Sequence, residues 1–458
     1  MLRQVIELLA ASFLLASPIR AQFPADSIVR SILRDRVENK RSTGIVVGLL
    51  EADGRTRVVA YNERAHGEPV FDQRTVFEIG SITKAFTGSL LADMVGRGEV
   101  KLDDPVSRFL PSSVRMPARA DKQITLLDLA TQTSGLPRLP GNLRPADMSN
   151  PYADYTVGDL YAFLSGHELT RDIGVQFEYS NLGVGLLGHV LALQAGKSYE
   201  ALVKERLLDP LRMSSTAITL SAESKARLAV GHNPAGAVVG NWDLPTIAGA
   251  GALRSTVEDM LKFLAAHVDS TASPLSKRLQ PAVRPQRPVP GGSIGFAWML
   301  APRPDRTIVW HNGGTGGYRT FAGFDQKNRR AVVVLTNSAI GADDIGLHLL
   351  DPGIPLQAAP ATLPVVRKEI SVSLAVLEPY VGEYQLAPNF AIVVTREGDR
   401  LFGQPTGQQR FQLWPESETD FFLKEVDAQV RFVKDSTGKV TSLILVQGGQ
   451  QAPARKIR

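Results

Sequence analysis

A serine and a lysine three residues apart form the strongest chemical signal in the chain. Ser81 and Lys84 lie in the segment FEIGSITK, residues 77–84, where a loop pattern changes to a helical one. Residues at this spacing share one face of a helix, so the two side chains are neighbours. A serine hydroxyl becomes a nucleophile when a base takes its proton. A lysine can be that base only if burial or a nearby positive charge lowers its pKa.

The same spacing also fits a helix cap followed by a solvated lysine, so other segments must decide. The segment GVQFEYSNLG, residues 174–183, places Tyr179 two positions before Asn181. A tyrosine can act as a base when cations stabilise its phenolate, and an asparagine amide can both donate to and accept from a substrate amide. Taken alone, this triplet is more typical of a core tyrosine followed by a loop asparagine.

A third segment, WHNGGTGG at residues 310–317, is rich in glycine. We predict that a strand ends here and that the glycines allow a ligand to lie close along the backbone. An edge strand can pair with an extended substrate, and one of its amides can bind an oxyanion. The alternative is a simple hairpin with a tight glycine turn.

The hydrophobic pattern predicts the elements that position these side chains. Two β-branched runs, 44–50 and 56–61, flank an Asp-Gly turn and indicate a hairpin. A four-residue apolar repeat predicts a helix over 81–94, and a mostly helical pattern fills 120–280. Strands return at 295–300, 308–310, 321–324 and 331–335. We therefore expect an α+β fold, in which one antiparallel sheet takes strands from both ends of the domain and is flanked by helices plus a helical region.

The two ends of the chain differ from this central part. Residues 1–21 combine an early arginine, a short apolar run and a terminal alanine, which predicts a cleaved signal peptide rather than a retained anchor or an N-terminal helix. Residues 351–366 hold four prolines and are interpreted as a linker. Short strand-like runs in 367–458 predict a small antiparallel β-barrel. The domain between signal and linker is 22–350, and the mature protein is expected to be periplasmic or secreted.

Composition excludes several kinds of function. The formal charge of +5 over 458 residues is a weak bias and does not favour nucleic acid as a partner. The absence of cysteine excludes a thiol nucleophile, disulfides and thiolate metal sites. The seven histidines contain no H-x-x-x-H pair, so we expect neither a metal nor another cofactor. The G-x-S-x-G match at 291–295 follows a proline-rich stretch and is interpreted as a loop, not a nucleophile elbow.

Together, the S-x-x-K, Y-x-N and H-x-G segments resemble those of the penicillin-recognising serine hydrolases. They are most similar to the class C β-lactamase family, which includes D-alanyl-D-alanine carboxypeptidases, D-aminopeptidases and esterases. The resemblance spans residues 27–345, and residues 375–458 resemble the lipocalin-like domain attached to some of these enzymes. It implies a class C β-lactamase-like fold followed by the small barrel.

The resemblance also implies a role for each candidate residue. Ser81 would be the acylated nucleophile, with Lys84 and Tyr179 as its base system. The amides of Ser81 and Gly314 would form the oxyanion hole. The substrate would be bound by residues of two segments, namely Asn181, His311, Asn312, Gly313 and Gly314.

Two positions depart from the class C pattern. His311 stands where class C β-lactamases carry a lysine, and Thr83 stands where they usually have serine or alanine. A lysine is a fixed cation for a substrate carboxylate, whereas a histidine with its ordinary pKa of about 6.5 is charged only part of the time. Histidine is frequent here in carboxypeptidases, so the position weakens the assignment to a dedicated lactamase.

The sequence thus predicts an exported serine hydrolase that acts through an acyl-enzyme on β-lactams, needs no metal or cofactor, and has no membrane span after signal cleavage. The alternative within the family is a D-alanyl-D-alanine carboxypeptidase, D-aminopeptidase or esterase. The expected partner is in each case a small-molecule or peptide substrate. An alternative from another class is a non-catalytic protein that binds cell-wall fragments or, through its barrel, an apolar ligand.

Overall fold

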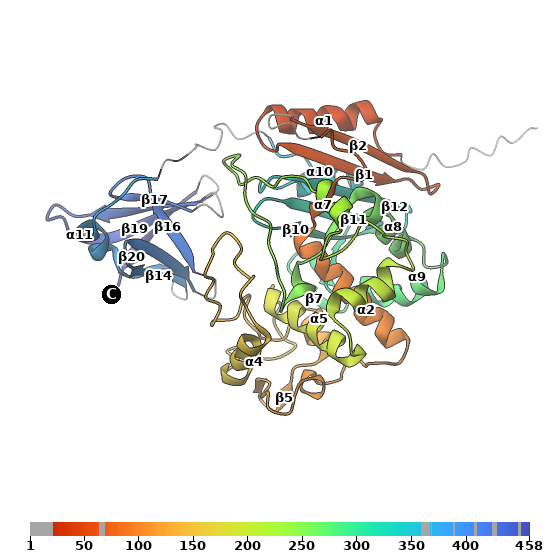
Figure 1. Cartoon of the computed structure of the whole chain (residues 1–458), viewed down its shortest axis with the longest axis horizontal. Helices are drawn as coiled ribbons and strands as arrows, with labels where there is room; N and C mark the ends of the chain where they lie inside the picture. Colours follow the sequence, from red (N-terminus) through yellow and green to blue (C-terminus); the bar gives the residue numbers. More distant parts are fainter. Residues whose placement is uncertain are drawn as a thin grey trace, which may run out of the picture.

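The computed structural model describes residues 22–63, 69–358, 367, 369–387, 390–406, 410–423, 428–447 and 450–458. The predicted signal peptide, 1–21, and much of the predicted linker lie outside the described residues. A larger domain with a central sheet and a smaller barrel are the two parts of the chain (Figure 1). Within the described ranges, no helix is both long and apolar enough to span a membrane.

An eight-stranded antiparallel sheet forms the centre of the larger domain, with the order β2-β1-β12-β11-β10-β9-β8-β7. Because β1 pairs with β12, the N-terminal hairpin and the later strands form one sheet, as the pattern predicted. Its strands are β1 (Gly44–Leu50), β2 (Thr56–Asn62), β7 (Arg287–Val289), β8 (Gly292–Ile294), β9 (Met299–Pro302), β10 (Thr307–Gly314), β11 (Arg319–Asp325) and β12 (Arg330–Thr336).

Helices cover both faces of this sheet. On one face, α1 (Asp26–Glu38) and α10 (Asp343–Leu350) bury an apolar cluster against alternate residues of the strands. On the other face, α8 (Val257–Val268) packs on β1 and β12, and α2 (Thr83–Gly96) lies deeper in the domain (Figure 1). Since α2 is buried on nearly every side, it is the central helix on which the site is built.

The helical region lies beside α2 and contributes α5 (Asn181–Ala195), which packs against it. Two small ladders join β3 (Val76–Glu78) to β6 (Arg254–Thr256) and β4 (Ala118–Arg119) to β5 (Lys122–Gln123). The other helical elements are η1 (Gly80–Ile82), η2 (Val106–Phe109), α3 (Leu126–Ala130), α4 (Val157–Gly166), α6 (Tyr199–Val203), η3 (Lys204–Leu208), α7 (Ala222–Ala226), η4 (Ala248–Ala250), α9 (Pro274–Leu279) and η5 (Gln280–Val283).

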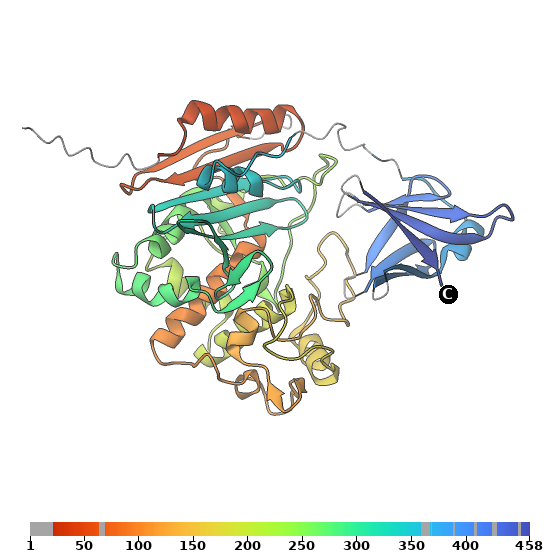
Figure 2. The ribbon, with the colours of Figure 1, turned by 180° about the vertical axis from the view of Figure 1, so that it is seen from behind.

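The C-terminal part is a closed antiparallel barrel in which β13 to β20 follow one another in order. It is preceded by α11 (Leu374–Leu377) and η6 (Glu378–Tyr380). Its strands are β13 (Gly382–Ala387), β14 (Phe390–Glu397), β15 (Arg400–Pro405), β16 (Phe411–Pro415), β17 (Asp420–Phe422), β18 (Ala428–Lys434), β19 (Val440–Gln447) and β20 (Gln450–Lys456). Figure 2 shows the barrel beside a loop of the larger domain. A hydrogen bond from Arg410 and the charge of Arg144, which lies in that loop, lower the pKa of Glu397.

The structure differs from the sequence expectations at three places near the site. Residues 80–82 form a separate 3-10 turn before α2, so the predicted helix begins at Thr83. β10 spans Thr307–Gly314 and is longer than the predicted strand 308–310, although it ends within the glycine-rich segment as expected. The segment 291–295, interpreted as a loop, contributes strand β8 to a hairpin, and the following strand is Met299–Pro302 rather than 295–300.

Candidate active site

The turn that carries Ser81 is packed directly against the end of β10. Gly80 has a φ of +50°, and a Cβ atom there would lie 2.6 Å from the backbone nitrogen of Gly314. The hydroxyl of Thr320 donates to the carbonyl oxygen of Ile79 over 2.9 Å and fixes the start of the turn. Only glycine combines this positive φ with this close approach. The chain therefore places the Ser81 segment beside the amide of Gly314.

Lys84 lies below the serine and is fully buried, with 0% of its side chain exposed. Its Nζ donates to three neutral acceptors, namely Ser81 Oγ at 3.1 Å, Asn181 Oδ1 at 2.8 Å and the carbonyl oxygen of Ala250 at 2.6 Å. Burial lowers the pKa of Lys84 well below its ordinary value, and the positive charge of Arg138 lowers it further. A neutral amine beside the serine hydroxyl is thus accessible, as a general base requires.

Tyr179 lies on the other side of the serine. Its hydroxyl lies close enough to that of Ser81 for the serine to affect the pKa of Tyr179. Its ring centroid is 4.9 Å from Lys84 Nζ and 5.0 Å from Arg138 Cζ. Burial raises the pKa of Tyr179, while the interaction with Ser81 and the charge of Arg138 act in the opposite direction. At neutral pH the phenol is protonated and suited to pass a proton rather than to take the first one.

The segment that holds Tyr179 is fixed by the loop 132–138. Ser180 caps α5 by accepting from the amide of Gly183 over 2.8 Å, and its hydroxyl donates to the carbonyl of Pro137 over 2.6 Å. The amide of Ser180 donates to the side-chain oxygen of Gln132. Asn181, at the first position of α5, is oriented toward Lys84 by this cap. The serine of the Y-S-N triplet therefore supplies the helix cap that positions its two neighbours.

His311 lies on β10 and faces the site. Its ring centroid is 6.4 Å from that of Tyr179, and only 2% of the residue is exposed. Burial and the charge of Lys84 lower the pKa of His311 to about 3, although its hydrogen bond with the carbonyl of Asn312 acts against this shift. The imidazole is therefore neutral at physiological pH. It cannot supply the fixed positive charge of the lysine found here in class C β-lactamases.

The next residues of β10 alternate between the two faces of the sheet. The side chain of Asn312 donates to the carboxylate of Asp343 in α10, on the face away from the serine. The structure thus does not bring the side chain of this predicted substrate-binding residue to the site, because the period of a strand is two. At Gly313, a Cβ atom would lie 2.0 Å from the carbonyl oxygen of Ile79, so a side chain would force the Ser81 segment away from β10.

Sequence reasoning missed two contributors to the site. Ala250, in η4, supplies a carbonyl to Lys84, but an apolar side chain gives no hint of such a role. Arg138 lies in the segment GLPRLP, residues 135–140, and was not among the predicted site residues. The signal that could have revealed it is a basic residue within a loop of glycine and proline.

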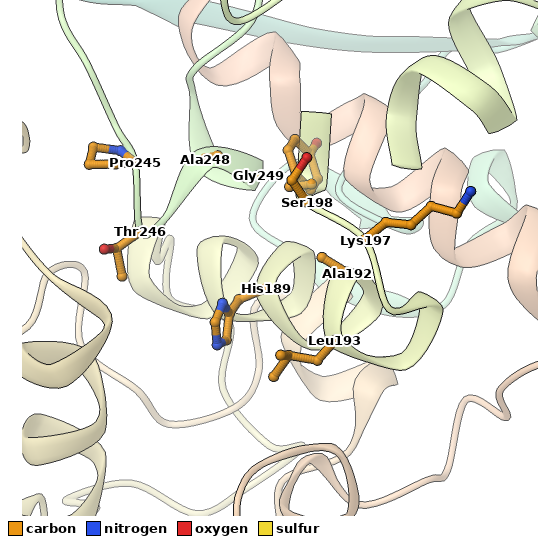
Figure 3. Close-up of a pocket in the computed structure, with 10 residues that line it drawn as sticks. His189, Ala192, Leu193, Lys197, Ser198, Pro245, Thr246, Ala248 and Gly249 are labelled. Carbon is orange, nitrogen blue, oxygen red and sulfur yellow. The ribbon is translucent and has the colours of Figure 1, made fainter. Parts of the chain in front are cut away.

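A separate cavity of about 260 Å³ lies behind η4, between α5 and the start of α6 (Figure 3). His189, Leu193, Lys197 and Thr246 are among the residues that line it, and none of the predicted site residues does. This cavity is therefore distinct from the cluster of predicted site residues around Ser81.

Comparison with known proteins agrees with this arrangement. The Beta-lactamase family profile matches residues 29–350, and a domain of unknown function, DUF3471, matches residues 366–454. The match to DUF3471 leaves the lipocalin-like resemblance of the barrel a prediction.

Among the relatives is the D-alanyl-D-alanine-carboxypeptidase/endopeptidase AmpH of Escherichia coli, 34% identical over 346 residues, which are 71% of this chain and 87% of AmpH. A beta-lactamase of the same species is 27% identical over 68% of this chain and 88% of its own length. The solved beta-lactamase/D-alanine carboxypeptidase of Yersinia pestis, complexed with citrate, is 26% identical over 72% of this chain and 98% of its own, with a TM-score of 0.58. The chain belongs to the beta-lactamase family of penicillin-recognising serine hydrolases.

Proposed function

We propose that this serine hydrolase cleaves peptides that end in D-alanyl residues through an acyl-enzyme on Ser81, and that penicillins react with it as mimics of that substrate. The observation that carries the proposal is the fully buried Lys84, which contacts the serine hydroxyl and has only neutral acceptors around it. A buried lysine with a lowered pKa is costly to keep and is typical of a catalytic base.

In the acylation step, the proton of the Ser81 hydroxyl passes to the neutral amine of Lys84 while Oγ attacks the substrate carbonyl carbon. The carbonyl oxygen becomes an oxyanion, which in this proposal the amides of Ser81 and Gly314 bind; the close packing of Gly80 against the Gly314 nitrogen supports this role. Tyr179, whose hydroxyl lies close to that of Ser81, delivers a proton to the leaving nitrogen and regains one from Lys84. Loss of one oxyanion donor costs about 10²- to 10³-fold in kcat in other hydrolases, so this contact carries a large share of the catalysis.

The second half of the reaction uses the same groups. Water replaces the leaving amine and attacks the acyl carbon while its proton passes to the neutral amine of Lys84, directly or through Tyr179. The acyl group then leaves as a carboxylic acid, and Lys84 returns the proton to Ser81. Asn181 has its side-chain oxygen on Lys84 and its side chain also interacts with the hydroxyl of Tyr152. Because the amide nitrogen carries two N–H donors, one of them can still contact the substrate.

The peptide substrate is favoured over a dedicated lactamase activity by His311. A class C lactamase has a lysine there, whereas this imidazole is buried and neutral. The 34% identity to a carboxypeptidase/endopeptidase, against 27% to a beta-lactamase, points in the same direction. β-Lactam hydrolysis is the second candidate, since a relative named beta-lactamase matches 68% of this chain and 88% of its own length.

One experiment separates these outcomes from each other and from a binding role. The intact mass of the protein is measured after mixing with a penicillin, in parallel with assays of ring opening and of D-alanine release from a peptide ending in D-Ala-D-Ala. A long-lived adduct with D-alanine release supports the peptidase. Rapid ring opening with little adduct identifies a lactamase. No adduct, no turnover and no labelling by a serine-reactive probe would favour a non-catalytic binding protein.

The matched variants are Ser81→Ala and Ser107→Ala. Ser81→Ala should abolish turnover and labelling while the protein stays folded, and Tyr179→Phe should lose about 10²-fold or more, as expected for a proton-transfer group. Ser107 is exposed and bonded to Gln123 on a remote surface, so its loss should change nothing. Full turnover by folded Ser81→Ala would disprove the assignment.

We further infer that the mature chain is exported after cleavage near residue 21, with domains 22–350 and 367–458 joined by the linker 351–366. The pattern of the first 21 residues supports this inference. N-terminal sequencing of the protein from the periplasm and the growth medium tests it.

A further inference from the structure

Arg138 is an exposed arginine at the edge of the active site. Its guanidinium lies over the ring of Tyr179, with Cζ 5.0 Å from the ring centroid. Its backbone is held because its carbonyl oxygen accepts the amides of Asn181 and Leu182 at the start of α5. No carboxylate of the described residues forms an ion pair with this guanidinium. The loop thus presents a fixed, uncompensated positive charge beside the nucleophile.

The other basic groups around the serine are not available to a substrate anion. Lys84 is buried and directs its donors at three protein acceptors. His311 is neutral because of its burial. Arg319, at the start of β11, is partly buried, and its Nη1 donates to the carbonyls of Thr315 and Tyr318. The charge of Arg138 is the one left open to solvent among these groups.

We propose that Arg138 binds a carboxylate of the substrate and so selects anionic peptides for cleavage at Ser81. A guanidinium stacked on an aromatic ring keeps its N–H groups in the plane of the stack, where they can hold a carboxylate with two parallel hydrogen bonds. This inference rests on the proposed function and names the chemical class that the site prefers. The carboxylate can belong to the leaving D-alanine or to a side chain in the acyl half of the peptide.

The alternative is that Arg138 does not contact the substrate and acts only through its charge, which lowers the pKa of Tyr179 and of Lys84. The two ways differ in what they do to a neutral substrate. An arginine that acts through the catalytic groups changes kcat for every substrate alike. An arginine that binds a carboxylate changes KM, and only for substrates that carry the carboxylate.

The test compares Arg138→Gln and Arg138→Lys with the parent enzyme on three matched substrates. The first is a peptide ending in D-Ala-D-Ala with a free terminal carboxylate and a neutral acyl half. The second has the same acyl half and a terminal carboxamide, and the third adds a glutamate side chain to that carboxamide peptide. Rates are taken on each variant's pH plateau, so that changed pKa values of Lys84 or Tyr179 do not enter. Arg144→Gln is the control, because Arg144 is exposed on the same loop and bonds only to nearby carbonyls.

We expect Arg138→Gln to lower kcat/KM for one carboxylate substrate by about 10- to 100-fold through KM, the range for a lost hydrogen bond to a charged group. For the neutral carboxamide peptide, kcat/KM should change by less than about threefold. Arg138→Lys should recover part of the loss, since it keeps the charge but not the paired geometry. The substrate that responds identifies the half of the peptide that Arg138 contacts. Equal losses on all three substrates, or none on any, would overturn the proposal.

A failure of the proposed function is visible separately. If the parent enzyme cleaves none of the three peptides, Ser81 can still be labelled by two phosphonate probes that differ only in a carboxylate and its methyl ester. A preference for the anionic probe that disappears in Arg138→Gln supports the role of Arg138 without the peptidase activity. Labelling with no such preference would overturn it.

Discussion

The catalytic domain and the barrel both bury polar side chains, but they treat them in opposite ways. In the barrel, Tyr380 donates to the carbonyl of Glu418 and Tyr384 donates to that of Tyr380, each over 2.8 Å. Tyr380 also stacks on Phe432 with ring centroids 4.0 Å apart. The barrel interior is thus filled by aromatic rings whose hydroxyls have ordinary neutral partners, and this burial stabilises the fold.

In the catalytic domain, burial acts on groups whose protonation near neutral pH it can change, whereas in the barrel it only raises the already alkaline pKa of Tyr384. Lys84 is a fully buried amine with a lowered pKa and no carboxylate hydrogen-bonded to it, and the pKa of His311 falls to about 3. Such an arrangement costs stability and is typical of sites where the protonation state matters. The comparison therefore predicts that changes in the site alter chemistry more than stability, and that changes in the barrel core do the reverse.

The largest loss of activity by a residue other than Ser81 is expected at Gly80. In Gly80→Ala, the new Cβ atom would lie 2.6 Å from the nitrogen of Gly314 and would disfavour the φ of +50°. The strand end must then move away from Ser81, and kcat should fall about 10²- to 10³-fold, as when an oxyanion donor is lost. Steady-state kinetics and labelling of Ser81 measure this.

Gly54→Ala is the control for Gly80, because Gly54 also has a positive φ, +89°, but no atom lies within 4 Å of the added Cβ. It carries the conformational strain without the clash, and its kcat should equal that of the parent. A similar loss in both variants would show that backbone strain, not the contact with Gly314, is responsible.

Lys84→Met should lower kcat/KM by about 10²-fold or more, because the general base is removed. Its free energy of unfolding should change by less than about 2 kcal/mol, because two effects oppose each other. Asn181 and Ala250 lose their hydrogen-bond donor, which destabilises the fold, but the polar amine no longer has to be buried, which stabilises it. Lys84→Arg keeps a cation that does not deprotonate, so it should be equally inactive. Urea unfolding and kinetics test both claims, and an active arginine variant would reduce Lys84 to an electrostatic role.

Much of this could be predicted from the sequence, because the informative signals are local. The N-terminal hairpin and β12 were predicted from β-branched runs, and the sheet that joins them was confirmed. Ser81, Lys84, Tyr179 and Asn181 come together in the structure as a cluster around Lys84 Nζ. Their catalytic roles remain predictions, because geometry alone does not test them.

The parts that sequence missed depend on long-range contacts or on backbone atoms. β20 contains Pro453 and polar residues, so its pattern does not indicate a strand, yet it closes the barrel by pairing with β13 and β19. Asn312 was predicted as a substrate-binding residue together with its neighbours in the segment. Because side chains alternate along β10, the side chain of Asn312 points to Asp343 instead of to the site. The neutral state of His311 follows from burial against Lys84, which no local pattern contains.

The pH dependence of kcat/KM distinguishes the ionisation of Lys84 from that of His311. Because the neutral amine of Lys84 is the base, kcat/KM should rise with pH through the lowered pKa of Lys84, which lies well below 10.5. His311, with a pKa of about 3, is neutral throughout and should contribute no second step. The profile should therefore show one rising limb, which ends in a plateau well below pH 10.5. His311→Gln should keep that limb in place, and its disappearance in this variant would assign the ionisation to the histidine instead.

The smallest effect on activity is expected in the barrel. Tyr384→Phe removes the hydroxyl that donates to the carbonyl of Tyr380, in a side chain that is 0% exposed. The barrel should lose about 1 kcal/mol of unfolding free energy, the usual value for one buried hydrogen bond, while kcat and KM stay unchanged. Tyr61→Phe serves as the control, because it removes only a surface hydrogen bond from Tyr61 on β2 to Glu38 at the end of α1. It should leave the unfolding transition in place. A drop in kcat for Tyr384→Phe would break the comparison, because the barrel core would then be coupled to the chemistry at Ser81.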